Sequence, residues 1–116
     1  MRLYVDNPVV NINGISRAAQ AAPFVDPASG QPMIPLRMVA ETLGVQTNWR
    51  PGSQAVVLVR GNTSFTLPIG EPLPNNMGTA MIVDGRTFVP LAFVSQALGA
   101  NVLWDEVNGV VHILAI

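Results

Sequence analysis

The chain has 116 residues, the length of one ordinary domain, and 49% of them are hydrophobic, which is enough to bury a core. Its six basic residues, all arginine, nearly balance seven acidic ones for a net charge of −1, so there is no basic footprint for nucleic acid or for an anionic membrane. Cysteine is absent, which excludes disulfides, thiolate zinc sites and cysteine nucleophiles.

The start of the chain, Met1–Asp6, lacks the apolar stretch of a secretory signal. No window approaches the roughly 18 consecutive apolar residues that span a membrane, so we expect no membrane insertion. The composition is equally compatible with a cytoplasmic protein and with a mature or excised piece of a longer chain that carries an added Met1.

A short helix is predicted in the first half of the chain. Apolar residues at positions i, i+3, i+4 and i+7 between Leu36 and Leu43 form one stripe, the pattern of an amphipathic helix. Pro35 suits the first helical position, where its missing N–H costs nothing, and Gly44 follows where helices commonly end in a left-handed residue. Because so short a helix is unstable alone, we expect it to pack on a sheet.

The following segment predicts two β-hairpins. Apolar and polar residues alternate over 45–49, which is typical of a half-buried strand, and the turn-rich Arg50–Ser53 leads into a β-branched run. Gly61-Asn62 is a two-residue hairpin signal that leads to a strand over 63–67. The Pro- and Gly-rich stretch 68–78 is then expected as a connecting loop.

The same order of residues returns 55 positions later without a gap. Six pairs are identical: Pro35/Pro90, Leu36/Leu91, Val39/Val94, Leu43/Leu98, Gly44/Gly99 and Trp49/Trp104. A hairpin turn at Asp84-Gly85 precedes the second helix. The predicted fold is α+β, one domain over 1–116, in which two β-β-α-β-β repeats (about 9–60 and 63–115) pack short amphipathic helices on antiparallel sheet. One compact unit is favoured because roughly 50 residues alone make a marginal core.

Residues suited to catalysis or metal binding are few. His112 is the only histidine and lies in an apolar run, whereas metal sites need several converging ligands, so we expect no metal and no cofactor. The carboxylates Asp105-Glu106 lie in a predicted turn, where exposed charge is ordinary. Since nucleophile elbows, phosphate loops and dinucleotide fingerprints are also missing, the chain is predicted not to be an enzyme.

Three residues are candidates for contact with a ligand or partner. Trp49 and Trp104 share strand faces with apolar neighbours, which favours core packing, and the alternative is stacking of their exposed rings on sugars. Arg86 either pairs with a carboxylate or caps carbonyl groups near the second helix, or it contacts an anion or a partner. Solvent quenching of tryptophan fluorescence distinguishes the two interpretations of the tryptophans.

Three linked motifs of the second copy resemble a known family: Gly85-Arg86-Thr87-Phe88-Val89-Pro90-Leu91, then Ala97-Leu98-Gly99-Ala100-Asn101-Val102, then Trp104-Asp105. They resemble the copper amine oxidase N-terminal-like (stalk) domain, and the likeness extends over about Val9 to Leu114. The first copy keeps Pro35-Leu36-Arg37, Ala40-Glu41-Thr42-Leu43-Gly44 and Trp49. The chain departs from the family pattern at Gln31 and at Ala92, where arginine is usual.

The resemblance implies an antiparallel sheet wrapped on a helix and a stalk that lies away from the copper and the quinone cofactor. It also implies a secreted or cell-surface bacterial protein, for which we expect a non-catalytic role in spacing, oligomerisation or attachment to the cell wall or to a partner protein. The alternative is a carbohydrate (peptidoglycan)-binding module that uses exposed Trp. The low surface charge and apolar strands further favour a homodimer through strand edges.

Overall fold

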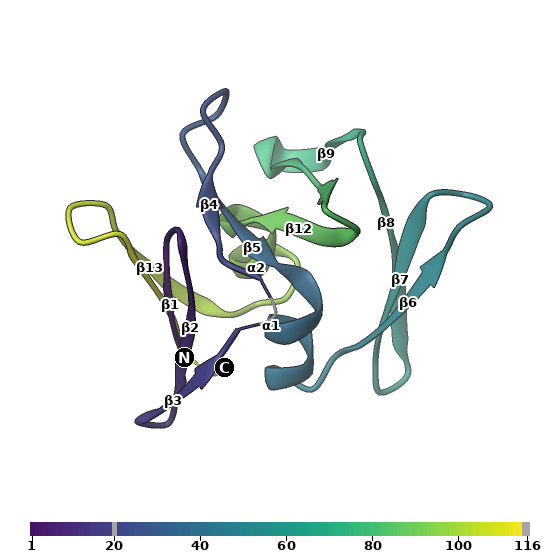
Figure 1. Cartoon of the computed structure of the whole chain (residues 1–116). Helices are drawn as coiled ribbons and strands as arrows, with labels where there is room; N and C mark the ends of the chain where they lie inside the picture. The colour runs from purple at the N-terminus through teal and green to yellow at the C-terminus, as the bar shows by residue number, and fades with distance from the viewer. Residues whose placement is uncertain (20, 115–116) are drawn as a thin grey trace.

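A four-stranded antiparallel sheet lies at the centre of the fold, in a computed structural model that describes residues 1–19 and 21–114 (Figure 1). Its strands run in the order β11 (Met81–Val83), β12 (Arg86–Pro90), β5 (Pro32–Pro35) and β4 (Phe24–Val25). The two halves of the chain therefore share one sheet, because its two inner strands come one from each half. Together with two short helices, this sheet gives the α+β fold that the sequence predicted.

The register between the inner strands β5 and β12 is symmetric. Ile34 pairs with Val89, which is also its counterpart 55 positions later in the sequence. On either side of this pair, Met33 lies opposite Pro90 and Pro35 opposite Phe88. Equivalent segments of the two halves thus meet about a local two-fold axis, and Ile34 and Val89 at that axis are both fully buried.

Each inner strand leads directly into a helix, α1 (Leu36–Thr42) after β5 and α2 (Leu91–Gln96) after β12. Pro35 and Pro90 are the N-cap residues, with extended ψ angles of 115° and 150°, so the predicted first helical position is wrong by one residue. The reason is that both prolines still belong to the ladder between β5 and β12. Gly44 and Gly99 follow the helices with φ of 77° and 71°, the left-handed conformation expected there.

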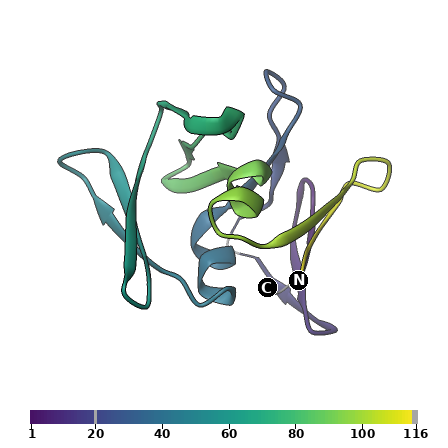
Figure 2. The same ribbon diagram turned by 180° about the vertical axis from the view of Figure 1, so that it is seen from behind.

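Two further sheets extend on opposite sides of the central sheet (Figures 1 and 2). One contains three strands in the order β6 (Gln46–Arg50), β7 (Ala55–Arg60) and β8 (Thr63–Pro68). The other contains five strands in the order β13 (Asn101–Asp105), β14 (Val110–Leu114), β1 (Arg2–Tyr4), β2 (Asn7–Ile12) and β3 (Ile15–Ala18). The predicted boundary between the repeats placed β8 in the second repeat, but β8 is hydrogen-bonded to the β6–β7 hairpin of the first.

The stretch 68–78 has more structure than the connecting loop that the sequence predicted. It contains β9 (Pro72–Leu73) and a single 3-10 turn (Pro74–Asn76), and β9 pairs with β10 (Gly78–Thr79). The side chains of Leu73 and Met77 are buried in the core, so this segment covers apolar surface as well as joining the halves.

One apolar cluster connects the helices and the sheets. It contains Val39 and Ala40 of α1, Val94 of α2, and residues of the outer sheets such as Leu58 and Val111, all nearly inaccessible to solvent. Within the described residues no buried polar side chain interrupts this cluster. No helix among them is long and apolar enough to cross a membrane. Burial of apolar surface is thus the main force that holds the two halves together.

Candidate binding groove

A groove of about 460 Å³ opens between α1, the β6–β7 hairpin and the β11–β12 hairpin. The side chains that give it its chemistry are Arg37, Met38, Thr47, Trp49, Ile82 and Arg86. Elements from both halves of the chain form its walls, because β12 lies next to β5 in the central sheet. The groove brings together two of the three predicted contact residues, Trp49 and Arg86.

Trp49 is the fourth of the five residues of β6 and is 46% exposed, so the prediction that it packs in the core is wrong. The alternation along the strand was read correctly, since Thr47 and Trp49 line the same groove. The end of the hairpin, however, extends away from the central sheet (Figure 1), and Trp49 lies near that end, one residue before the last residue of β6. Its cross-strand neighbour Val56 takes the buried position instead.

Trp104 occupies the equivalent position on β13, opposite Val111, but its environment is different. Its side chain is partly buried and packs against the apolar cluster. The structure therefore separates the two tryptophans, which the sequence treated alike: Trp104 lies against the core and away from the groove, and Trp49 lies open in it.

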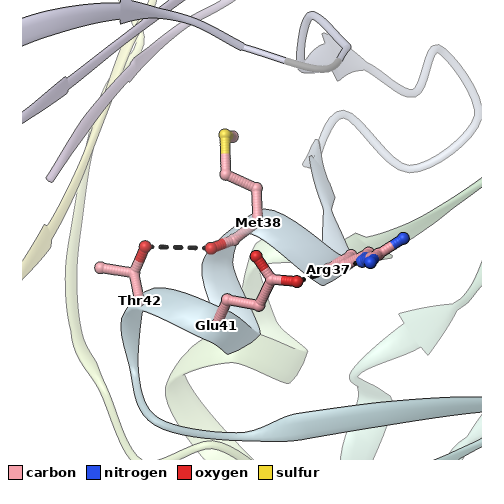
Figure 3. Close-up of polar contacts among 4 residues, drawn as sticks. All are labelled: Arg37, Met38, Glu41 and Thr42. Carbon is pink, nitrogen blue, oxygen red and sulfur yellow. Dashed lines mark hydrogen bonds and ion pairs between the residues drawn. The ribbon is translucent and has the colours of Figure 1, made fainter.

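Two arginines line the groove. Arg86 is exposed at the start of β12, and within the part of the chain that the structure describes its guanidinium has neither an ion-pair partner nor a side-chain hydrogen bond. Arg37 on α1 donates through Nε to the Glu41 carboxylate at 3.1 Å (Figure 3), and their side chains are 71% and 58% exposed. Exposed pairs at this helical spacing contribute about 0.3–0.5 kcal/mol, so Arg37 is available to a stronger partner.

A second, more open hollow of about 490 Å³ continues from the groove along α1 and β6. It shares Arg37 and Thr47 with the groove and adds the polar side chains of Glu41, Gln46 and Asn48. The groove and the hollow together therefore offer polar side chains as well as the apolar Met38 and Ile82.

The equivalent surface in the other half lacks both cations. Gln31 stands where Arg86 stands in the second half, and Ala92 stands where Arg37 stands in the first. Gln31 Oε1 instead accepts a long hydrogen bond of 3.4 Å from the Ala92 backbone N–H. In the second half, a hydrogen bond within the protein thus occupies the place of the two open arginines of the first.

The groove is lined by cationic, aromatic and aliphatic side chains and by two threonines. Among the residues that line it there is no histidine, serine or carboxylate to serve as a nucleophile or a general base. His112 lies elsewhere, on β14 opposite Arg2 and Leu103. Within residues 1–19 and 21–114 no three potential metal ligands gather in one place.

Asp105, which the sequence placed in a turn, is the last residue of β13, and it stabilises the β13–β14 turn that follows. Its two carboxylate oxygens accept hydrogen bonds from the Asn108 backbone N–H at 3.1 Å and from Asn108 Nδ2 at 2.8 Å. The side-chain bond, followed by the backbone bond, lowers the pKa of Asp105 below its ordinary value of 3.8. This carboxylate therefore has a structural role at the tip of the hairpin.

This chain belongs to the copper amine oxidase N-terminal domain family, whose model matches residues 11–113. The resemblance predicted from the sequence motifs is thereby confirmed. Membership in this family points to a non-catalytic domain. The family name also raises the question of copper, and the residues present do not fit a copper site built on several imidazoles or on thiolates, since the sequence holds one histidine and no cysteine.

Among curated proteins, the chain is similar to a protein of Brevibacillus choshinensis named "Protease inhibitor". The two are 34% identical over 100 residues, which cover 80% of this chain and 30% of the relative. The chain thus spans less than a third of the length of that relative. No solved structure matches this chain.

Sequence reasoning missed Arg37, Met38 and Ile82 as groove residues. Arg37 follows the buried Leu36 on α1 and so faces away from the core, which a helical projection of the stripe indicates. Ile82 gave no such signal, because its place beside Trp49 depends on the pairing of β11 with β12 and of β12 with β5.

Proposed function

We propose that this chain is a non-catalytic binding module of a larger bacterial cell-surface protein, and that its groove attaches the protein to a cell-wall polysaccharide. The observation that carries the proposal is the exposure of Trp49, a residue 46% accessible to solvent in a groove that also contains Arg86. The family membership supports a non-catalytic role. The relative, of which this chain covers 30%, supports a place within a longer protein.

A solvent-exposed indole beside Met38 and Ile82 leaves apolar surface in contact with water, and such surface on soluble proteins commonly marks a binding site. The flat face of an indole suits the C–H face of a sugar ring, and its N–H remains free to hydrogen-bond a hydroxyl group. Thr47 in the same groove supplies a hydroxyl group for a hydrogen bond to a sugar. Attachment through a sugar polymer is therefore the interaction role that these side chains favour.

Co-sedimentation with isolated Gram-positive cell walls tests this function. We expect saturable pelleting of the chain, and a loss of about tenfold in apparent affinity for Trp49→Ala, the size expected for one lost stacking contact. Leu103→Ala is the matched control, because Leu103 is an exposed apolar residue, 62% accessible, on the other outer sheet. Added copper is expected to change nothing. Equal pelleting of Trp49→Ala and the unaltered chain, or no pelleting at all, contradicts the proposal.

A second candidate function, inhibition of a protease, follows from the name of the Brevibacillus relative. The favouring observation is the tip of the β13–β14 hairpin, where Val107 is 94% exposed in a turn held by Asp105 and Asn108. A protruding apolar side chain on a held turn suits insertion into an apolar pocket of another protein. Residual activity of serine and metalloproteases, measured with a molar excess of the chain and of Val107→Gly, tests it, and undiminished proteolysis argues against it.

A further inference from the structure

We infer that the ligand of the Trp49 groove is an acidic polysaccharide, whose sugar rings stack on Trp49 while ring carboxylates bind Arg86 and Arg37. This inference rests on the proposed function and specifies the ligand of the same groove. It comes from the charges of the groove and from a comparison between the two halves of the molecule.

The lining of the groove is cationic although the whole chain is slightly acidic. Arg37 and Arg86 both line it, and no aspartate or glutamate does. The net charge of −1 means that these arginines are not part of a generally basic surface. A guanidinium group binds a carboxylate through two parallel N–H···O bonds, so an anionic ligand with planar carboxylates matches this lining.

The second half of the molecule indicates that the fold itself does not need these arginines. The equivalent positions hold Gln31 and Ala92, and there too a strand leads through a proline N-cap into a short helix, while Trp104 packs against the core. An arginine needed only to hold a strand or a helix in place would be needed at both positions. Both arginines instead occur together on the side where the tryptophan is open.

Glu41 makes the two arginines of this site differ in how available they are to a ligand. Its carboxylate holds Arg37 Nε at 3.1 Å and lines the adjacent hollow, whereas Arg86 has no such partner within the described residues. A ligand carboxylate must compete with Glu41 for Arg37 but meets no competitor at Arg86. Arg86 is thus the main anchor, and removal of the Glu41 charge strengthens binding.

The test compares polygalacturonate with its fully methyl-esterified form, which keeps the rings and removes the charges. Titration of the intact chain by calorimetry is expected to give affinity for the acid about tenfold or more above that for the ester, as for one charge-assisted contact. Arg86→Gln should remove most of the preference for the acid over the ester, with the remainder due to Arg37, and Glu41→Gln should raise binding of the acid. Arg17→Gln, which removes the same charge from exposed β3, is the matched control.

Each alternative outcome has one meaning. Equal binding of acid and ester, both abolished by Trp49→Ala, overturns the acidic ligand and leaves the proposed function standing. Equal losses in Arg86→Gln and Arg17→Gln overturn it as well, because they indicate a general charge effect. Poly-L-glutamate that binds more tightly than polygalacturonate assigns the groove to acidic peptides instead. Failure to bind the acid also overturns the inference, and the proposed function falls with it only if cell walls too fail to pellet the chain.

Discussion

The two outer hairpins, β6–β7 and β13–β14, follow helices of similar length and carry a tryptophan at the same position, yet their surfaces differ. Trp49 is open in a groove with two arginines, whereas Trp104 packs against the core, and the positions equivalent to the arginines hold Gln31 and Ala92. The five-stranded sheet adds β1, β2 and β3 beside β14, while the three-stranded sheet ends at β8. Equivalent backbones thus serve two purposes, stabilisation in one half and an open surface in the other.

This difference shows that the backbone conformation of a segment and the solvent exposure of its side chains have separate causes. Local residues such as Gly44 and Gly99 fix the chain path in both halves. Whether a strand face is covered depends on distant segments that pair or pack beside it. A duplicated pattern therefore predicts equal elements, but it does not predict equal burial.

The largest expected effect lies at the local two-fold axis, where the halves are equivalent. Ile34→Ala should lower the free energy of unfolding by about 2–5 kcal/mol, because the fully buried side chain leaves a cavity in the shared core. Val89→Ala, which removes less volume from the same contact, should cost about 2 kcal/mol. Urea unfolding followed by circular dichroism and by tryptophan fluorescence measures both. Two separate transitions in the unaltered chain would contradict a core shared by both halves.

The tryptophans give the next effect and separate the halves. Trp104→Ala should destabilise by about 2 kcal/mol, less than for a fully buried ring because Trp104 is partly exposed. Trp49→Ala should cost under about 1 kcal/mol, since its burial is incomplete. Acrylamide quenching of Trp49→Phe and Trp104→Phe, each with one remaining tryptophan, checks the exposure directly. Equal quenching of the two would refute the difference between the hairpins.

Much of the local structure was predictable because its causes are local. The apolar stripe from Leu36 to Leu43 predicted α1, and the turn residues Gly61-Asn62 and Asp84-Gly85 predicted two of the hairpins that form. The left-handed Gly44 was expected for the same reason, because only glycine adopts that conformation cheaply.

The missed features all depend on contacts between distant segments. The pairing of Leu3 with Val111 joins opposite ends of the sequence, and alternation within either strand does not reveal its partner. Trp49 has the sequence pattern of a half-buried strand, but it is exposed near the end of β6, in a hairpin that extends beyond the central sheet (Figure 1). Two of the six side chains that give the groove its chemistry, Trp49 and Arg86, were therefore named from sequence, and their shared groove was not.

A smaller effect, expected in both halves, tests the left-handed glycine that follows each helix. Gly44→Ala should cost about 1 kcal/mol because an alanine at φ 77° is strained, although its Cβ would meet no atom within 4 Å. Gly52→Ala, at an equally open turn position without positive φ, is the control and should change stability little. Gly99→Ala should match Gly44→Ala. Unfolding midpoints in urea measure all three, and a neutral Gly44→Ala would argue against the left-handed helix end.

The smallest effect concerns pH and is confined to one hairpin. Asp105 has a lowered pKa because Asn108 donates to its carboxylate, whereas the equivalent residue of the other hairpin is Arg50, which carries no carboxylate. A group whose folded pKa lies below its unfolded value of 3.8 contributes stability that is present above pH 3.8 and is lost as the pH falls through the folded pKa.

Asp105→Asn should therefore be slightly less stable than the unaltered chain at pH 7, and the difference should disappear as the pH falls below the folded pKa of Asp105. Thermal unfolding of both proteins from pH 7 to pH 2 measures this, with Glu106→Gln, a neighbouring exposed acid, as control. A difference that persists unchanged at pH 2 would show that Asn at this position disturbs the turn by its shape and not by its charge. Because the β6–β7 hairpin has no such carboxylate at its turn, acid should loosen the β13–β14 hairpin while the Trp49 groove stays formed.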